Sequence, residues 1–153
     1  MTAVLQIINH ATVYADGDLS GDVGKGLYIL LGVSESDTEE DARLLAEKIP
    51  KLRIFSDENG KMNLSVTDID GEALVVSNFT LCANYSHGNR PDYFSAAKPD
   101  IANKLYESFV AMLSEKVRRV ATGRFGADMR TEMSTDGPVT IVMQSELLKK
   151  RNG

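Results

Sequence analysis

The sequence has a single cysteine, two histidines and no tryptophan in 153 residues. With Cys82 alone, the chain can form neither an internal disulfide nor a zinc site built from cysteines. His10 and His87 are too few and too widely separated for a typical metal cluster. We therefore expect no metal and no cofactor. Cys82 is interpreted as a small, partly or fully buried residue, because free cysteines are among the most buried residue types.

Long apolar runs are also absent. The longest, around residues 27–33, is far too short to cross a bilayer, which takes about 20 apolar residues. The start of the sequence, Met1-Thr2-Ala3-Val4-Leu5, has no basic region ahead of an apolar one and is typical of a strand rather than a signal peptide. We therefore expect a cytoplasmic protein that does not use a membrane.

Basic charge is scarce: 17 Lys and Arg are outnumbered by 22 Asp and Glu, which gives a net charge of −5. This disfavours broad non-specific binding of nucleic acid, but it permits a small footprint on an RNA end. The local basic groups are interpreted as solvated surface charge. They are Arg90, Lys98 and Lys104, then Lys116, Arg118, Arg119 and Arg124, and the tail Lys149-Lys150-Arg151.

The composition is otherwise that of an ordinary globular protein, with 42% hydrophobic and 25% charged residues. No linker or repeat interrupts the chain, so we expect a single domain over residues 1–153. Apolar residues between 42 and 49 recur at the spacing of one helical face. The expected elements are strands at 4–9, 12–15 and 26–33, a helix within 34–51, a strand ending at 77, a helix from 99 to about 120, and two strands within 126–144 joined at 134–138. This order predicts an α+β fold.

Two short motifs combine strand ends with unusual backbone. The first, Ser77-Asn78-Phe79-Thr80-Leu81, ends an apolar run and presents hydroxyls and backbone N–H groups where the sheet stops. The second, Thr135-Asp136-Gly137-Pro138-Val139-Thr140, opens the last apolar run. Glycine permits another chain or a ligand to approach closely, and proline fixes φ and removes a donor. Together the motifs are candidates for a pocket that senses shape and chirality through the main chain, although each alone also fits a plain strand end or turn.

The motifs resemble those of the D-aminoacyl-tRNA deacylases, editing enzymes that remove D-amino acids from tRNA. The family patterns are Ser-Gln-Phe-Thr-Leu and Asn-x-Gly-Pro-Val-Thr. Asn78 stands in place of Gln, Thr135 in place of Asn, and Ile7 where the family commonly has Arg. Further matches run over nearly the whole chain: Ala11-Thr12-Val13, Gly26-Leu27, Leu30-Leu31-Gly32-Val33, Leu52-Arg53-Ile54-Phe55-Ser56-Asp57, Gly60-Lys61-Met62-Asn63-Leu64, Arg90-Pro91, Ala97-Lys98-Pro99, Thr122-Gly123-Arg124-Phe125-Gly126-Ala127 and Met129.

The resemblance implies a barrel-like, mostly antiparallel sheet with two long helices packed outside, in a homodimer. It implies hydrolysis of D-aminoacyl-tRNA, and of Gly-tRNA mischarged on tRNA-Ala, with the aminoacylated 3′ end as partner. It also implies that Gly137-Pro138 is cis and enters the partner subunit's pocket, where its carbonyls exclude an L side chain. Thr135 flanks this tip. Phe125 is a candidate to stack on the terminal adenine, although a core aromatic fits the pattern equally well.

Few side chains near the first motif are suited to catalysis. Ser77 and Thr80 each need a base to act as a nucleophile, and neither histidine can be placed beside them from sequence. Ester hydrolysis needs an activated water and a site for the oxyanion, which backbone N–H groups around Phe79 and Thr80 can supply. The resemblance implies the same: catalysis by residues 77–80, Asn78 included, through the main chain and the RNA 2′-OH, with no metal.

Two alternatives stay open at this level. The three departures also fit a dimeric module that binds tRNA ends and has lost activity, because Asn78 is one methylene shorter than Gln. A small-molecule esterase or amidase acting on D-amino acid derivatives is the other. A comparison of D-Tyr-tRNA with the free ester of D-Tyr as substrates separates the three hypotheses.

Overall fold

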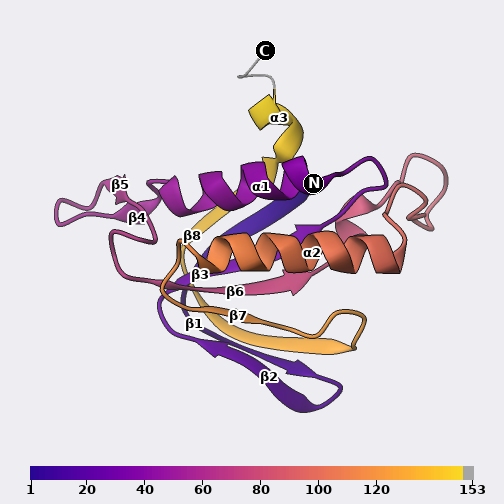
Figure 1. The fold of residues 1–153 in the computed structure, drawn as a ribbon. Helices are drawn as coiled ribbons and strands as arrows, with labels where there is room; N and C mark the ends of the chain where they lie inside the picture. The colour runs from indigo at the N-terminus through magenta and orange to yellow at the C-terminus, as the bar shows by residue number, and fades with distance from the viewer. Residues whose placement is uncertain (150–153) are drawn as a thin grey trace.

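Six strands form one strongly curved, mixed sheet in the computed structural model of the protein, which describes residues 1–149 (Figure 1). They are β1 (Thr2–Ala15), β2 (Asp18–Val23), β3 (Gly26–Gly32), β6 (Glu72–Ser77), β7 (Val120–Thr122) and β8 (Met129–Gln144). β1 pairs antiparallel with β2, β3 and β8, whereas β6 runs parallel to both β3 and β7. A separate hairpin joins β4 (Phe55–Ser56) to β5 (Met62–Leu64).

The two ends of the main strand path, β2 and β7, approach each other and nearly close the sheet. The Ser20 hydroxyl donates to the carbonyl oxygen of Thr122 at 3.0 Å. The Arg119 guanidinium donates to the carbonyl oxygen of Asp22. Side chains thus bridge the remaining gap. The predicted α+β, barrel-like fold is confirmed, with two parallel pairings in a sheet that is otherwise antiparallel.

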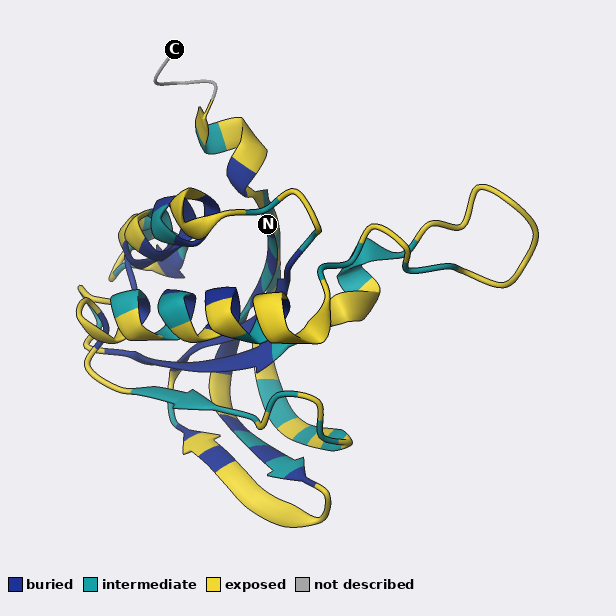
Figure 2. Ribbon diagram, turned by 45° about the vertical axis from the view of Figure 1, so that its right-hand side comes forward, coloured by how far each residue is buried: buried dark blue, intermediate teal, exposed yellow. Residues whose placement is uncertain are grey.

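The two long helices, α1 (Glu39–Lys48) and α2 (Pro99–Ser114), lie side by side over one face of the sheet (Figure 1). The larger core cluster fills the space beneath them and includes Leu45 and Phe109, both fully buried. A second cluster, with Ile8 and Leu74, covers the other face of the sheet. β3 and β6 are therefore buried on both faces (Figure 2), which explains their continuous apolar sequences.

Both predicted helices are present; α1 lies within the predicted range, whereas α2 is shorter than expected. α1 occupies the middle of residues 34–51, and a 3-10 turn, η1 (Ile49–Lys51), follows it. α2 ends at Ser114 rather than near residue 120. The reason is that Val117, although beyond the helix, is still buried in the core, so the apolar spacing runs on past the last helical turn.

The first and last strands are each longer than expected. Residues 4–9 and 12–15, predicted as two strands, belong to the single strand β1, and residues 126–144, predicted as two, form the single strand β8 from Met129. The two strands pair from one end to the other, with register shifts near their middle. The predicted junction at residues 134–138 is therefore an interruption within a strand, because pairing with β1 resumes on either side of it.

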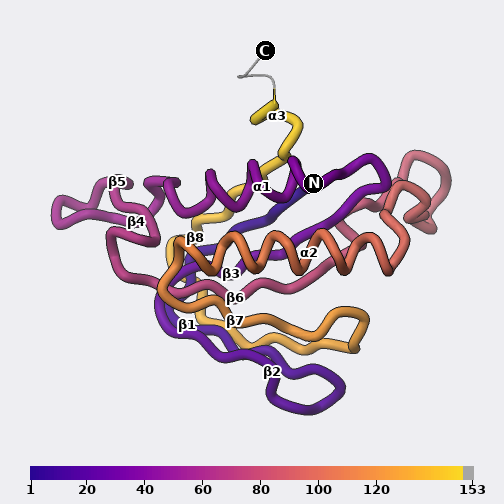
Figure 3. Tube along the Cα trace, in the orientation of Figure 1, coloured from indigo at the N-terminus to yellow at the C-terminus, as the bar shows by residue number. Residues whose placement is uncertain are grey.

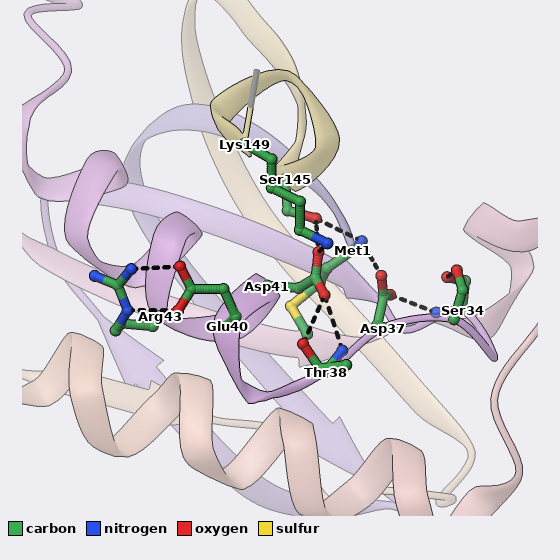
Figure 4. A network of polar contacts seen from close by, with 10 residues as sticks. Met1, Ser34, Asp37, Thr38, Glu40, Asp41, Arg43, Ser145 and Lys149 are labelled. Atoms are coloured by element: carbon green, nitrogen blue, oxygen red, sulfur yellow. Dashed lines mark hydrogen bonds and ion pairs between the residues drawn. The ribbon is translucent and has the colours of Figure 1, made fainter. Parts of the chain in front are cut away.

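A buried polar cluster joins β1, α1 and α3 (Ser145–Lys149) (Figure 4). The Met1 ammonium lies 2.5 Å from Asp37 Oδ1 and donates to the Ser145 hydroxyl oxygen at 2.8 Å. The Ser145 hydroxyl donates to Asp41 Oδ1 at 2.6 Å, and the Lys149 ammonium lies 2.8 Å from the same oxygen. Asp41 is 1% exposed, so these partners neutralise its charge inside the protein. Lys150 and Arg151 of the basic tail lie outside the described residues.

Replacing Asp41 by asparagine is expected to lower the free energy of unfolding by about 2 kcal/mol at pH 7. Burial opposes ionisation of Asp41, but hydrogen bonds from Lys149, Ser145 and Thr38 outweigh it and hold the pKa of the carboxyl well below its usual range. A carboxyl whose pKa is lowered by folding stabilises the protein above its unfolded pKa, about 3.9, and this contribution is lost as the pH falls.

Urea unfolding of the wild type and Asp41→Asn between pH 7 and pH 3 measures this contribution. The difference in free energy of unfolding between the wild type and Asp41→Asn is expected to be constant near neutrality and to become smaller below about pH 4. A difference that does not change with pH would show that the ionised carboxylate is not what stabilises the cluster.

Candidate functional site

The chain turns sharply after β6 into a 3-10 turn, η2 (Phe79–Cys82), at the rim of a cavity of about 620 Å³. This volume is within the range of about 300–1,000 Å³ that is typical of small-molecule sites. The wall combines the end of β6, the start of α2 and the loop before β8. Its residues are Leu31, Val33, Ser77, Asn78, Phe79, Tyr93, Ala96, Ala97, Lys98, Pro99, Ala102, Tyr106, Phe125, Gly126, Ala127 and Met129.

The wall of the cavity is mostly apolar and offers few groups that can move a proton. Among the residues that the structure describes, no histidine, carboxylate or cysteine lines it, and its titratable side chains are Tyr93, Lys98 and Tyr106. Within residues 1–149, no three or more histidine, cysteine or acidic side chains gather in a way that would hold a metal ion. The wall therefore supplies main-chain donors and hydroxyls rather than an acid–base pair.

Asn78 organises the turn that follows Ser77. Its side-chain oxygen accepts the backbone N–H of Thr80 at 3.2 Å and also accepts the Thr80 hydroxyl. The backbone N–H of Asn78 donates to the carbonyl oxygen of Leu31 at 2.8 Å. Because the Thr80 N–H is engaged in this way, the Phe79 N–H, at the first position of η2, is the donor that the motif leaves for a ligand.

Two aromatic contacts shape the wall. Phe79 is 61% exposed and meets Tyr93 edge to face, with ring centroids 5.1 Å apart. Phe125 is half-buried and lies against Tyr106, with centroids 6.1 Å apart. The buried Tyr106 hydroxyl donates to the carbonyl oxygen of Val75 at 2.8 Å, so it ties α2 to β6. Phe125 thus packs on the core with one part of its ring and lines the cavity with another.

The second motif forms a bulge in β8 and lies outside the cavity of its own chain. Residues 136–139 project from the β1–β8 ladder opposite a single residue, Ile7. Gly137 has a φ of 122°, and its bond to Pro138 is cis, as the resemblance implies. Gly137, Pro138 and the flanking Thr135 are exposed. The bulge is therefore a tip of main chain that no other part of residues 1–149 covers.

Two of the three departures from the family pattern have a visible structural consequence. Asn78 uses its short side chain to hold Thr80, as described above. Ile7 is 6% exposed and belongs to the core cluster beneath the helices, against which Val139 of the bulge also packs. The base of the bulge is thus supported by apolar contacts, without the donors of an arginine. Nothing in the structure explains threonine at position 135.

The cavity brings together half of the site residues predicted from sequence, namely Ser77, Asn78, Phe79 and Phe125. Thr80 turns its hydroxyl to Asn78, and the three residues predicted on β8 lie elsewhere. The contribution of residues 93–102 to the wall was not predicted from sequence. The segment Ala97-Lys98-Pro99 was the available signal, but it was interpreted only as a match to the family pattern and as a helix start. The hydrogen bond from the Ala97 N–H to the Val33 carbonyl at 3.0 Å is what brings this segment to the site.

The family model for D-Tyr-tRNA(Tyr) deacylase matches residues 4–144 of the chain. A D-aminoacyl-tRNA deacylase of Anaeromyxobacter dehalogenans (strain 2CP-C) is 52% identical over 148 residues, which cover 97% of this chain and 99% of the relative. Another of that name, from Persephonella marina (strain DSM 14350 / EX-H1), is 53% identical over 148 residues, covering 97% of this chain and all of the relative at 100%.

Solved structures agree with the near-closed sheet. One of a protein named c-Myc DNA Unwinding Element Binding Protein gives a TM-score of 0.88 at 38% identity, covering 94% of this chain and 98% of the other. The structure of a probable eukaryotic D-amino acid tRNA deacylase gives a TM-score of 0.80 at 17% identity, covering 94% of this chain and 99% of the other. At this identity the likeness is one of fold alone. None of the helices within the described range is long and apolar enough to span a membrane. Because the family model and the close relatives cover almost the whole chain, the protein belongs to the D-Tyr-tRNA(Tyr) deacylase family.

Proposed function

We propose that the protein hydrolyses the ester bond of D-aminoacyl-tRNA in the cytoplasm and releases free tRNA and the D-amino acid. The family is one of hydrolases that act on ester bonds. The observation that carries the proposal is the cavity at the end of β6, where a main-chain donor and four aromatic rings meet and no described histidine or carboxylate is present. Such a wall suits an ester whose own neighbouring hydroxyl takes part in the reaction.

The chemistry follows from what the wall and the substrate each supply. The terminal adenine stacks on Phe125, which places the ester beside η2. Water attacks the ester carbonyl carbon, and the Phe79 N–H stabilises the oxyanion that forms. The vicinal ribose hydroxyl positions the water. When the tetrahedral intermediate collapses, the bond from the carbonyl carbon to the ribose oxygen breaks, and the ribose oxygen takes up the proton that the attacking water gave up. The water oxygen stays in the carboxyl group of the amino acid.

The proposed assembly is a homodimer in which Gly137-Pro138 of one protomer enters the cavity of its partner. The exposed bulge at residues 136–139, which lies outside its own chain's cavity, supports this arrangement. Its carbonyls would crowd the side on which an L side chain projects, whereas a D side chain points away and glycine has none. Gly-tRNA mischarged on tRNA-Ala is then a second substrate. Light scattering at micromolar concentration should give the mass of a dimer, and a fully active monomer would rule the arrangement out.

Deacylation of D-Tyr-tRNA, compared with hydrolysis of D-Tyr methyl ester, tests the proposed function. The tRNA ester is expected to be cleaved and the methyl ester to be almost untouched, since it has neither the adenine nor the ribose hydroxyl. Equal hydrolysis of both would favour a small-molecule esterase. Binding of tRNA without hydrolysis would favour an inactive module that recognises tRNA ends.

Ser77→Ala and Thr80→Ala are each expected to keep deacylation of D-Tyr-tRNA within about tenfold of the wild type. The loss of a true nucleophile costs on the order of a thousandfold or more, but no described histidine or carboxylate lines the cavity and the Thr80 hydroxyl is held by Asn78. Single-turnover rates measure the effect, with circular dichroism to confirm folding. A thousandfold loss in either variant would identify that hydroxyl as the nucleophile.

A further inference from the structure

We propose that the loop between η2 and α2 guides the single-stranded 3′ tail of the tRNA to the cavity, with bases of the tail stacking on Tyr85 and Phe94. This inference rests on the proposed function and extends it to the nucleotides that precede the terminal one. The surface in question, residues 83–98, is called the aromatic loop below. It forms a long excursion from the body of the protein in the chain trace (Figure 3).

The exposed aromatic rings of the described chain gather beside the cavity and on this loop. Among the large hydrophobic residues that are strongly exposed, the aromatic ones are Phe79 at 61%, Tyr85 at 79% and Phe94 at 87%. The other seven phenylalanine and tyrosine residues are buried or half-buried. Burying an aromatic ring against a partner is strongly favourable in free energy. A group of such rings exposed to water on a projecting segment therefore indicates an interaction surface.

The aromatic loop is held in shape by its own hydrogen bonds. Asn84 and Asp92 exchange backbone hydrogen bonds of 2.8 and 2.9 Å at its base. Asp92 Oδ1 also accepts the Phe94 N–H at 3.2 Å, and the Ser95 hydroxyl donates to the Cys82 carbonyl at 3.1 Å. The loop projects away from the sheet and helices in two views (Figures 1 and 2). Rings on such a support need little ordering when they bind a ligand.

The rings lead outward from the cavity. Phe79 and Tyr93 line the cavity and touch edge to face. Phe94 follows Tyr93 directly, and Tyr85 comes just after Asn84, in the segment that the Asn84–Asp92 pair closes off. A polymer whose last unit fills the cavity therefore has these rings within reach of its preceding units. The aminoacylated 3′ tail of a tRNA is such a polymer, and each of its bases has a face that can stack on an aromatic ring.

The charge of the aromatic loop suits a polyanion, although the chain as a whole carries −5. Its cations are Arg90 and Lys98, and its one carboxylate, Asp92, already accepts hydrogen bonds within the loop. Among the described residues, the ion pairs include neither Arg90 nor Lys98. Cations beside exposed rings are the combination by which proteins follow single-stranded nucleic acid, through charge on the backbone and stacking on the bases.

The test compares D-Tyr-tRNA with 3′-O-D-tyrosyl-adenosine, which lacks the preceding nucleotides. Phe94→Ser and Tyr85→Ser are expected to raise KM for D-Tyr-tRNA by about tenfold, the scale of one lost base–aromatic stack. kcat on the tRNA and hydrolysis of the adenosine ester should not change, and Phe94→Trp should keep the wild-type KM. Leu19→Ser is the matched control, because it removes a 64% exposed apolar side chain from β2 and should change nothing.

Three results would overturn the proposal. They are an equal loss on both substrates, an unchanged KM for the tRNA in both serine variants, and conversion of a dimer to a monomer by the same substitutions. The last would assign the rings to contact between copies of the chain. If the wild type cleaves neither substrate, the proposed function fails. Binding of uncharged tRNA then decides on the loop: weaker binding by Phe94→Ser supports it, and unchanged binding refutes it.

Discussion

L-Tyr-tRNA is expected to be hydrolysed at least about a hundredfold more slowly than D-Tyr-tRNA, a difference of roughly 2.7 kcal/mol in the activation free energy. In the proposed dimer, the main chain of the partner's tip occupies the space that an L side chain would need. Exclusion of the wrong enantiomer then requires no contact with the right one. Gly-tRNA, which has no side chain to exclude, should be cleaved at a rate closer to that of the D substrate.

Initial rates on D-Tyr-tRNA, L-Tyr-tRNA, Gly-tRNA and L-Ala-tRNA under identical conditions measure this selectivity. Gly137→Ala is the informative variant, because a Cβ on Gly137 would lie 2.5 Å from the Val139 nitrogen and must displace the tip. Discrimination against L-Ala-tRNA should fall in this variant while D-Tyr-tRNA is still cleaved, since the Phe79 N–H does not belong to the tip. If the wild type cleaves L-Ala-tRNA as fast as D-Tyr-tRNA, the proposed gate is wrong.

The departures from the family pattern make this comparison more informative. Ile7 lies opposite the bulge and is buried, so the base of the tip rests on apolar packing. Packing is less directional than the hydrogen bonds of a guanidinium. A tip held in this way is expected to lose its exclusion of L side chains before hydrolysis itself is lost, because a small displacement admits the side chain and leaves the oxyanion donor in place.

Gly26→Ala is expected to destabilise the fold by about 4 kcal/mol or more, a loss seen only when a substitution meets a specific steric or polar obstacle. Gly26 opens β3 with a φ of 158° and pairs with Glu72 at the start of β6. A Cβ at this position would lie 1.8 Å from the Glu72 carbonyl oxygen, so the parallel pairing of the two strands cannot form around it.

The matched control for this prediction is Gly60→Ala. Gly60 also has a positive φ, 75°, but a Cβ there would meet nothing within 4 Å. Gly60→Ala is therefore expected to lower the free energy of unfolding by about 1–2 kcal/mol, from the backbone conformation alone. Urea unfolding gives both values, and deacylation should disappear with the fold in Gly26→Ala because β6 brings Ser77 to the cavity. Similar losses in the two variants would show that close approach of β3 to β6 is not decisive.

Much of the fold could be predicted from sequence, namely those helices and strands whose burial produces a regular pattern of apolar residues. The apolar runs of β3 and β6 and the helical spacing of α1 were sufficient to identify these elements. A strand buried on both faces is apolar throughout, and a helix buried on one side has apolar residues every three or four positions. The end of α2 was predicted wrongly because Val117 is buried after the helix has ended. The continuity of β1 and β8 was missed because a bulge in a long ladder looks like a turn between two strands.

The candidate site divides in the same way. The first motif was recognisable because it ends an apolar run, and the second because a stiff Gly-Pro pair opens one. The role of Asn78 could not be predicted, since its bond to the Thr80 N–H depends on the conformation of η2. Nor could the wall formed by the start of α2, which depends on the pairing of the Ala97 N–H with Val33 of a segment far away in the chain.

By itself, the sequence determined the family, the α+β class, the two amphipathic helices and the position of the first motif at a strand end. The family follows from motifs that match in one order along nearly the whole chain, and the other three features depend on residue types at short spacing. Only the tertiary structure decided that the sheet nearly closes, that residues 93–102 complete the cavity, and that the Gly137-Pro138 tip stands outside the cavity of its own chain. These features depend on contacts between residues distant in sequence, and such contacts arise only when burial of the shared core brings the strands and helices together.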